Sequence, residues 1–417
     1  MTLQLKGGRL LCTATGVDRM GDLWVHQGRV RLSAPEGVQA QVIDCTGKVV
    51  TPALVDLDAR LCDPGYTWRE SLSTGGEAAL RGGFTCVVAN PETDPVTDDP
   101  SFVREVIARA GLESKVEIKV AAALTKGLGG EKLSELGLMA EAGAALFSNA
   151  DHLVSDSLVL RNALLYARPL GLPVMLRAGD AELESVAVMN EGASSALAGL
   201  RGIPAAAEEI GIARLIALAR YTGTHVHVLG VSTKLAIAQL KAGLASGAPI
   251  SGSTTALHCL LNDGEVLASG YDTDTRLMPP LRTEEDRLAL LEALADGTLL
   301  GVSSAHAPLT RVDKELEFAY ATPGALGLET ALSCLLSCAP LEHALRALSA
   351  GPAKLLGIER SLRDGAPAEL LVLDPEAKWT VDPTQFASRS ANTPLAGRQL
   401  SGVLAAVIHK GECLHPA

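Results

Sequence analysis

Eight short apolar runs alternate with helical segments along the middle of the chain, and this alternation leaves few folds open. The runs cover residues 49–57, 84–90, 116–124, 144–149, 173–178, 225–231, 249–255 and 299–306. Between them, residues 101–110, 205–223 and 283–297 have apolar side chains at the 3.6-residue spacing of a helix. Eight strand–helix units in succession predict an α/β fold, a (β/α)8 TIM barrel, whose functional residues follow the carboxyl ends of the strands.

Both ends of the chain carry short segments of β type with glycine turns. They are residues 3–11, 22–32, 41–50, 368–375 and 403–412. With 417 residues, the chain is long enough for a barrel and an appended domain. We therefore predict a small composite β-sandwich domain from residues 1–50 and 365–417, attached to a barrel of residues 51–364.

The composition argues against several classes of function. The net charge of −12 does not suit binding to a phosphate backbone, so we expect no nucleic-acid partner. The first residues lack a signal-peptide pattern, and no run of about 18 uncharged apolar residues follows, so we expect no export and no membrane span. The eight cysteines include no CxxC pair, which argues against a disulfide framework and favours a reducing cytoplasm.

Two opposite charges stand where the first barrel strand ends. Asp58 and Arg60 are two positions apart, so their side chains share one face of the strand. Pro64 and Gly65 then mark a turn. In a barrel, this places both charges at the carboxyl ends of the strands, where binding and catalysis take place. We call this end of the barrel the mouth.

Several segments, in their order and spacing, resemble the class I dihydroorotases of the amidohydrolase superfamily over nearly the whole chain. They include TPALVDLDARLCDPG, AALRGGFTCVVANPETDP, GLRGIPAAAEEIGIARLIALARYTG, MPPLR, AHAP, PGALGLET, GPAKLLGI and ANTPLAGRQLSG. The resemblance implies the same barrel and, in the family, zinc-dependent hydrolysis of a cyclic amide.

The chain departs from the family at the positions that the resemblance assigns to the site. In the family the first strand ends in His-x-His followed by Arg; here these positions are Asp58, Arg60 and Cys62. The other changed positions are Asn149 and Ala150 after strand four, Arg177 after strand five, Gly230 after strand six and Ala305 after strand eight, with Glu92, Met278 and Leu309 at family substrate contacts. His306 is retained.

These departures predict that zinc is not bound. A catalytic zinc site uses about three protein ligands from His or carboxylate side chains. Gly230 and Ala305 have no ligand atom in the side chain, and Arg60 and Arg177 bring permanent positive charge. Only Asp58 remains able to ligate, so we expect no cofactor, and we expect Asp58 to form an ion pair with Arg177 or Arg60.

Three histidines and one cysteine could in principle bind a metal or act in catalysis, but a structural role explains each of them more simply. His225 and His227 form a His-x-His pair, but without an evident third ligand they fit strand packing or a core hydrogen bond better than a metal site. For His306 we favour hydrogen bonding in the barrel mouth. Cys62 has no predictable base beside it, so we interpret it as a small filler residue and not as a nucleophile.

Three functions remain open. The first, which we favour, is a non-catalytic dihydroorotase-like protein: in several bacteria such chains, without the zinc ligands, assemble with the catalytic chain of aspartate carbamoyltransferase in pyrimidine biosynthesis. We expect this chain to be a homo-oligomer with that partner, and to lack enzyme activity. The second is an active dihydroorotase or hydantoinase-like amidohydrolase with an atypical metal site. The third is a module that binds a small anion.

Overall fold

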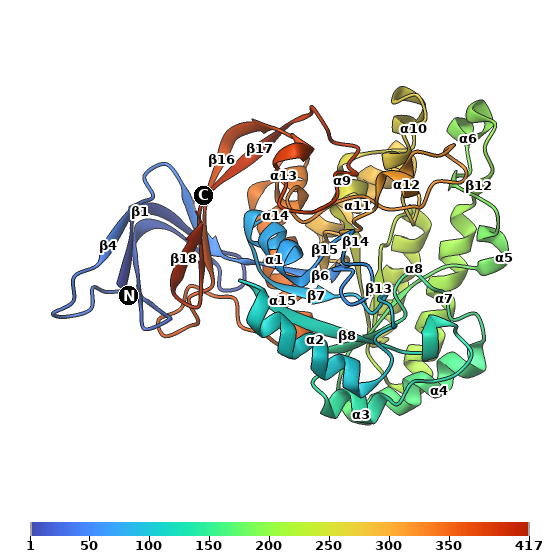
Figure 1. Ribbon diagram of the computed structural model, residues 1–417, viewed down its shortest axis with the longest axis horizontal. Helices are drawn as coiled ribbons and strands as arrows, with labels where there is room; N and C mark the ends of the chain where they lie inside the picture. The colour runs from blue at the N-terminus through green and yellow to red at the C-terminus, as the bar shows by residue number, and fades with distance from the viewer. Residues whose placement is uncertain (1, 416–417) are drawn as a thin grey trace.

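Eight parallel strands form the centre of the molecule. The structure is a computed structural model and describes residues 2–415 (Figure 1). The strands are β6 (Leu54–Ala59), β7 (Phe84–Ala89), β8 (Glu117–Ala123), β9 (Leu146–Ser148), β10 (Val174–Arg177), β13 (Val226–Leu229), β14 (Ile250–Thr255) and β15 (Gly301–Ser303). They pair in sequence order from β6 to β15, and a bridge between Ala59 and His306 brings the two ends of the sheet together. The (β/α)8 barrel is confirmed.

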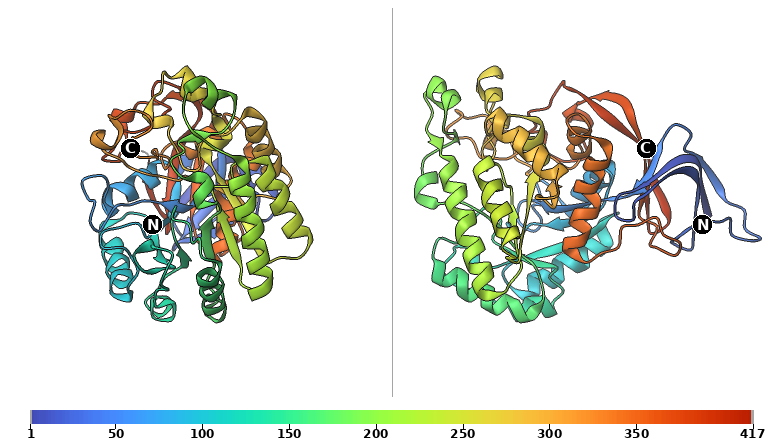
Figure 2. Two further views of the ribbon diagram at one scale, coloured as in Figure 1. Left: turned by 90° about the vertical axis from the view of Figure 1, so that its right-hand side faces the viewer. Right: turned by 180° about the vertical axis from the view of Figure 1, so that it is seen from behind.

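Helices surround this barrel (Figures 1 and 2). The longer ones are α1 (Leu72–Arg81), α2 (Pro100–Glu113), α4 (Ser157–Ala167), α7 (Ala205–Thr222), α8 (Lys234–Ala245) and α11 (Glu284–Ala295). The shorter ones are α3 (Leu136–Glu141), α5 (Ala181–Glu184), α6 (Ala193–Ala198), α9 (Ala256–Leu260), α10 (Gly264–Ala268), α12 (Arg311–Lys314), α13 (Ala331–Leu336), α14 (Leu341–Leu345) and α15 (Gly351–Leu356). Two short strands, β11 (Met189–Asn190) and β12 (Gly202–Ile203), form a separate ribbon.

Capping residues define where the helices begin. The three helices expected from periodicity are α2, α7 and α11. Asp99 caps α2 by accepting a hydrogen bond from the Ser101 N–H, and Thr283 caps α11 by accepting one from the Asp286 N–H. α7 starts directly after Pro204.

The first apolar run divides between two sheets. Its first part, β5 (Val49–Pro52), pairs with β16 (Leu370–Thr380), whereas its second part is the barrel strand β6. Pro52 has no N–H to continue the ladder, which accounts for the change of sheet at this point.

Strands from both ends of the chain form one continuous sheet beside the barrel (Figure 2). The remaining strands are β1 (Thr2–Cys12), β2 (Val17–His26), β3 (Arg29–Arg31), β4 (Gln41–Asp44), β17 (Gln399–His409) and β18 (Glu412–His415). An apolar cluster that includes Leu5, Leu23 and Leu370 packs within this sheet. The boundaries of a composite sandwich domain stay a prediction. Within residues 2–415 no helix is both long and apolar enough to span a membrane.

Candidate functional site

The carboxyl ends of the barrel strands enclose a very small cavity. Its volume is about 40 Å³. Its lining includes Asp58, Arg60, Asp151, Arg177, Gly230, Met278, Ala305 and His306. Such a space holds only a few water molecules, whereas a pocket for an organic ligand usually measures about 300 Å³ or more. The mouth is therefore almost filled by its own side chains.

Arg60 lies between two carboxylates supplied by loops. Its Nε is 2.9 Å from Oε2 of Glu92, and its Nη2 donates a hydrogen bond to Asp151. Although burial opposes ionisation, the charge of Arg60, with His152 3.8 Å away on the other side, lowers the pKa of Glu92 to about 2. The guanidinium charge of Arg60 is thus balanced inside the mouth.

Arg177 forms a bidentate pair with Glu184. Nη1 and Nη2 donate hydrogen bonds of 2.9 and 2.8 Å to the two carboxylate oxygens, and Nε donates one of 3.0 Å to the backbone oxygen of Asp151. Both side chains are buried, with exposed fractions of 7% and 10%. Glu184 is the last residue of α5, and Asp180 caps this short helix. The helix therefore fixes the position of the partner carboxylate.

Asp58 does not form the ion pair that the sequence suggested. Among residues 2–415, the ion pairs of Arg60 and Arg177 all go to other carboxylates. Asp58 instead accepts a hydrogen bond of 2.7 Å from Nδ2 of Asn90. The expectation is wrong because Asp151, on the loop after β9, and Glu184, at the end of the short helix α5, pair with the two guanidinium groups. The positions of these two carboxylates cannot be read from periodicity. Burial, reinforced by the charge of Asp151, raises the pKa of Asp58 to about 6.

A second aspartate ties the first barrel strand to the last. Asp56 is fully buried and accepts hydrogen bonds from the backbone N–H of Ser304 at 2.6 Å and from its hydroxyl at 2.7 Å. Burial raises the pKa of Asp56 to about 7. Asp56 is not among the residues predicted from the sequence, although a charged residue within an apolar run signals a buried polar contact.

His306 is held by hydrogen bonds on both ring nitrogens. Nδ1 accepts from the N–H of Gly327 at 3.3 Å, so the proton is on Nε2, which donates to Glu70 at 3.3 Å. Glu70 also accepts hydrogen bonds from Ser388 and Thr74. Burial opposes its ionisation, but the hydrogen bonds from His306, Ser388 and Thr74 outweigh this effect and lower the pKa of Glu70. This contact agrees with the hydrogen-bonding interpretation of His306.

The remaining candidates also lie in packed surroundings. The ring nitrogens of His227 are 2.8 Å from the hydroxyl of Ser251 and 2.9 Å from that of Ser253, and burial lowers the pKa of His227 to about 3. Its neighbour His225 contacts Ser251. Burial raises the pKa of the Cys62 thiol to about 12, so it is not a thiolate near neutral pH. Leu309 is buried; neither it nor Cys62 lines the cavity.

Comparisons with known proteins place the chain in a family. The family model described as Dihydro-orotase-like matches residues 47–236. A protein from Anaeromyxobacter dehalogenans named dihydroorotase is 40% identical over 99% of this chain and 98% of its own length. The chain belongs to the dihydroorotase family. A dihydroorotase from Geobacter metallireducens is 38% identical to this member over the full length of both chains.

Solved structures support the fold. The L-hydantoinase from Arthrobacter aurescens superposes with a TM-score of 0.87 at 24% identity, covering 99% of this chain and 95% of that one. A dihydropyrimidinase from Brevibacillus agri superposes with a TM-score of 0.82 at 19% identity, with the same coverage. At these identities the similarity concerns the architecture.

The side chains at the positions that the sequence resemblance assigns to the family's metal do not fit zinc. Ala150, Gly230 and Ala305 offer no ligand atom, and all three have a left-handed backbone, with φ of 50°, 64° and 47°. A Cβ at Gly230 would lie 3.1 Å from Cδ of Pro279, so a larger residue there would require Pro279 to shift. Arg60 and Arg177 would repel a divalent cation. Within the part of the chain that the structure describes, no three His, Cys, Asp or Glu side chains are grouped to hold a metal ion.

The raised pKa of Asp58 predicts a pH-dependent effect on stability. The folded state holds this proton more tightly than the unfolded state, whose ordinary value is 3.8, so Asp58 lowers stability as the pH rises from about 4 to above 6. We expect Asp58→Asn to be more stable than the wild type by about 2–3 kcal/mol near pH 8, and not more stable near pH 4. Urea unfolding at both pH values measures this difference. A variant less stable at pH 8 would contradict the assignment, and Glu376→Gln, an exposed change of the same type, is the control.

Proposed function

We propose that this dihydroorotase-family chain is catalytically inactive and acts as a structural subunit of an aspartate carbamoyltransferase complex in pyrimidine biosynthesis. One observation carries the proposal: the two arginine side chains at the positions that the sequence resemblance assigns to zinc ligands are paired with carboxylates at the mouth. Arg60 and Arg177 each have carboxylate partners that belong to the same chain. The charges are therefore arranged to stabilise the folded mouth, without an evident reacting group.

The two alternatives receive less support. A small-anion site needs free cationic groups and space, but both arginines are already paired and the cavity measures about 40 Å³. An active amidohydrolase with an atypical metal site needs clustered ligands. Asp58 accepts a hydrogen bond from Asn90, and the carboxylates near it, Asp151 and Glu92, pair with Arg60. Among residues 2–415 no three His, Cys, Asp or Glu side chains are grouped to hold a metal ion.

A structural role uses the surface of the protein, and the loops that follow the barrel strands expose several large apolar side chains. Val312 in α12 is 81% exposed, Tyr320 is 75% exposed, and Trp68 after β6 is 61% exposed. Large apolar side chains of this kind favour contact with another protein when they are grouped on one face. A stable interface buries about 1,000 Å² or more, and we expect the chain to form at least a dimer as well as the complex.

The proposal is tested by removing this chain from cells that retain the aspartate carbamoyltransferase catalytic chain. We expect the catalytic chain then to lose assembly or activity, as measured by the mass of the complex and by carbamoyl transfer in the lysate. Supplying the wild-type chain should restore both. A catalytic chain that assembles and works normally alone would refute the proposal.

A mouth variant separates a structural from a catalytic contribution. Asp58 is the one side chain at the matched positions that still has a ligand atom suited to zinc. We expect Asp58→Asn to restore assembly as well as the wild type does, because the proposed role does not use the mouth chemically. Failure of this variant, with normal folding and expression, would favour the amidohydrolase alternative.

A further inference from the structure

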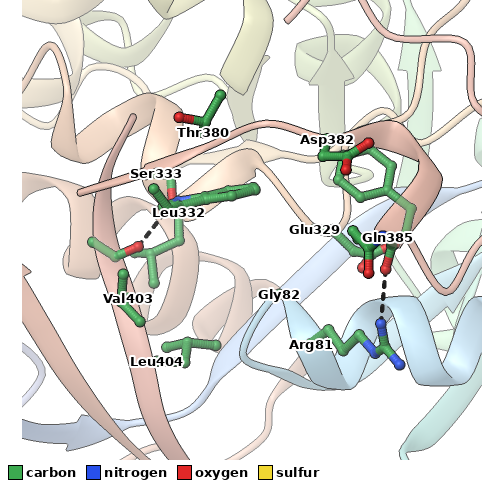
Figure 3. A pocket seen from close by; sticks show the side chains of 13 residues that line it. Arg81, Gly82, Glu329, Leu332, Ser333, Thr380, Asp382, Gln385, Val403 and Leu404 are labelled. Carbon is green, nitrogen blue, oxygen red and sulfur yellow. Dashed lines mark hydrogen bonds between the residues drawn. The ribbon is translucent and has the colours of Figure 1, made fainter. Parts of the chain in front are cut away.

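A larger pocket lies outside the barrel mouth, between the barrel helices α1 and α13 and the hairpin of β16 and β17 (Figure 3). Its volume is about 360 Å³, within the range of pockets that hold small organic ligands. None of its lining residues lines the mouth cavity. The pocket is therefore a separate candidate site.

One side of this pocket is apolar. The apolar residues that line the pocket as a whole are Leu332, Trp379, Phe386, Val403 and Leu404. Figure 3 shows Leu332, Val403 and Leu404 on the same side. The indole N–H of Trp379 donates a hydrogen bond of 3.0 Å to the hydroxyl of Ser333, which fixes the ring. This wall suits a flat or branched apolar group.

The other side carries polar groups. Glu329, Asp382 and Gln385 lie together there, opposite the apolar wall (Figure 3). Arg81 also lines the pocket, but its Nη1 donates to the backbone oxygen of Gln385 at 2.9 Å and its Nε lies 3.5 Å from Glu77. The carboxylates therefore outnumber the cations, and the one cation already has partners.

Glu329 has an oxygen available for a ligand. Its Oε1 accepts hydrogen bonds from the N–H groups of Ala387 at 2.9 Å and Ser388 at 3.4 Å. Its Oε2 has no hydrogen-bond partner among residues 2–415. This oxygen is also not fully buried. Glu329 lines the pocket, and a carboxylate held by one oxygen with the other unpartnered and not fully buried is a preorganised acceptor.

We propose that this pocket binds a small amphipathic amine, with the apolar body against Trp379 and Leu404 and the ammonium group on Glu329. The carboxylate of Asp382 adds attraction for the same charge. Neither Arg81 nor any other lining residue offers an unpartnered cation for an acidic ligand. This site is independent of the proposed structural role.

Protonation of Glu329 gives the binding a defined pH dependence. Burial raises the pKa of Glu329 to about 7, against the hydrogen bonds from Ser388 and Ala387. Among the nearby charges, Arg81 on α1 lowers this pKa and Glu70 before α1 raises it; Asp382 faces the same pocket from the segment after β16. Because a cation prefers the ionised carboxylate, affinity for an amine should rise by up to about tenfold between pH 6 and pH 8.

Calorimetric titration with tryptamine tests the proposal, with indole-3-propionate as a probe that has the same ring and the opposite charge. At physiological ionic strength, which screens the general attraction of an acidic protein for cations, we expect saturable binding of tryptamine and at least tenfold weaker binding of the acid. Equal affinities, or no saturable binding of tryptamine up to about 10 mM, would overturn the proposal.

Glu329→Gln supplies the decisive variant. Its amide oxygen can still accept the two backbone hydrogen bonds, so the fold should be retained, as a thermal melt can verify. We expect about tenfold weaker tryptamine binding and no pH dependence between pH 6 and pH 8. The exposed Glu376→Gln makes the same change of charge and should leave binding unaltered. If Glu329→Gln binds tryptamine as tightly as the wild type does, the ammonium group does not bind at Glu329 and the proposal is wrong.

Discussion

Replacing Arg177 by methionine is expected to lower the free energy of unfolding by about 3–5 kcal/mol, because Glu184 would be left as an unpaired buried carboxylate. The two side chains are 7% and 10% exposed, so water cannot take the place of the guanidinium. Both oxygens of Glu184 and the backbone oxygen of Asp151 lose their donor. Urea unfolding at neutral pH measures the loss.

A matched arginine on the surface provides the control. Arg311 pairs with Glu315 at 2.6 Å within one helical turn, but the two side chains are 88% and 62% exposed. We expect Arg311→Met to change the free energy of unfolding by less than about 0.5 kcal/mol. Equal losses in Arg177→Met and Arg311→Met would show that the buried pair does not hold the mouth.

Lys314→Met should also destabilise the protein, by about 3 kcal/mol. The Nζ of Lys314 donates to the backbone oxygens of Thr273 at 2.8 Å, Thr322 at 3.0 Å and Gly324 at 2.9 Å, which joins two loops over the mouth. Its side chain is 7% exposed, and Asp274 lies 3.8 Å away. Methionine keeps the apolar stem but removes the ammonium donor from three partly buried carbonyl groups and from one carboxylate. Of these groups, the Gly324 oxygen keeps a second donor in Asn392.

The same denaturation experiment with Lys234→Met controls for the loss of a lysine. Lys234 pairs with Glu285 at 2.6 Å, and these side chains are 48% and 73% exposed. We expect a change within about 0.5 kcal/mol for this variant. If Lys314→Met unfolds with a loss of less than about 1 kcal/mol, the three carbonyl contacts do not fix the loops.

The barrel could be predicted from the sequence because its strands and helices are periodic. The apolar run 225–231 contains β13, because a strand buried on both faces is apolar throughout. The helical spacing of apolar residues in 205–223 corresponds to α7, because a helix buries one face. The run 49–57 was assigned to a single strand, whereas Pro52 ends β5 in one sheet before β6 begins in another.

The partners of the mouth charges could not be predicted, because loops supply them. Arg177 ends β10 and pairs with Glu184, seven residues further on, only because the short helix α5 forms in the segment that follows β10. Asp151 reaches Arg60 from the loop after β9, which separates Arg60 from Asp58 as an ion partner. Such contacts depend on the course of each loop in three dimensions, which local propensity does not specify.

The central claim is that the mouth no longer supports zinc chemistry, and it has consequences for reversion. Arg60→His would restore one imidazole, but Ala150, Gly230 and Ala305 would still lack ligand atoms and Arg177 would remain charged. We therefore expect this variant to have no dihydroorotase turnover.

The most direct measurement is the zinc content of the purified chain, determined together with its turnover of dihydroorotate and of carbamoyl aspartate, beside an active dihydroorotase prepared in the same way. The account predicts substoichiometric zinc and no turnover in either direction, for the wild type and for Arg60→His. One or more tightly bound zinc ions per chain, accompanied by turnover, would contradict it.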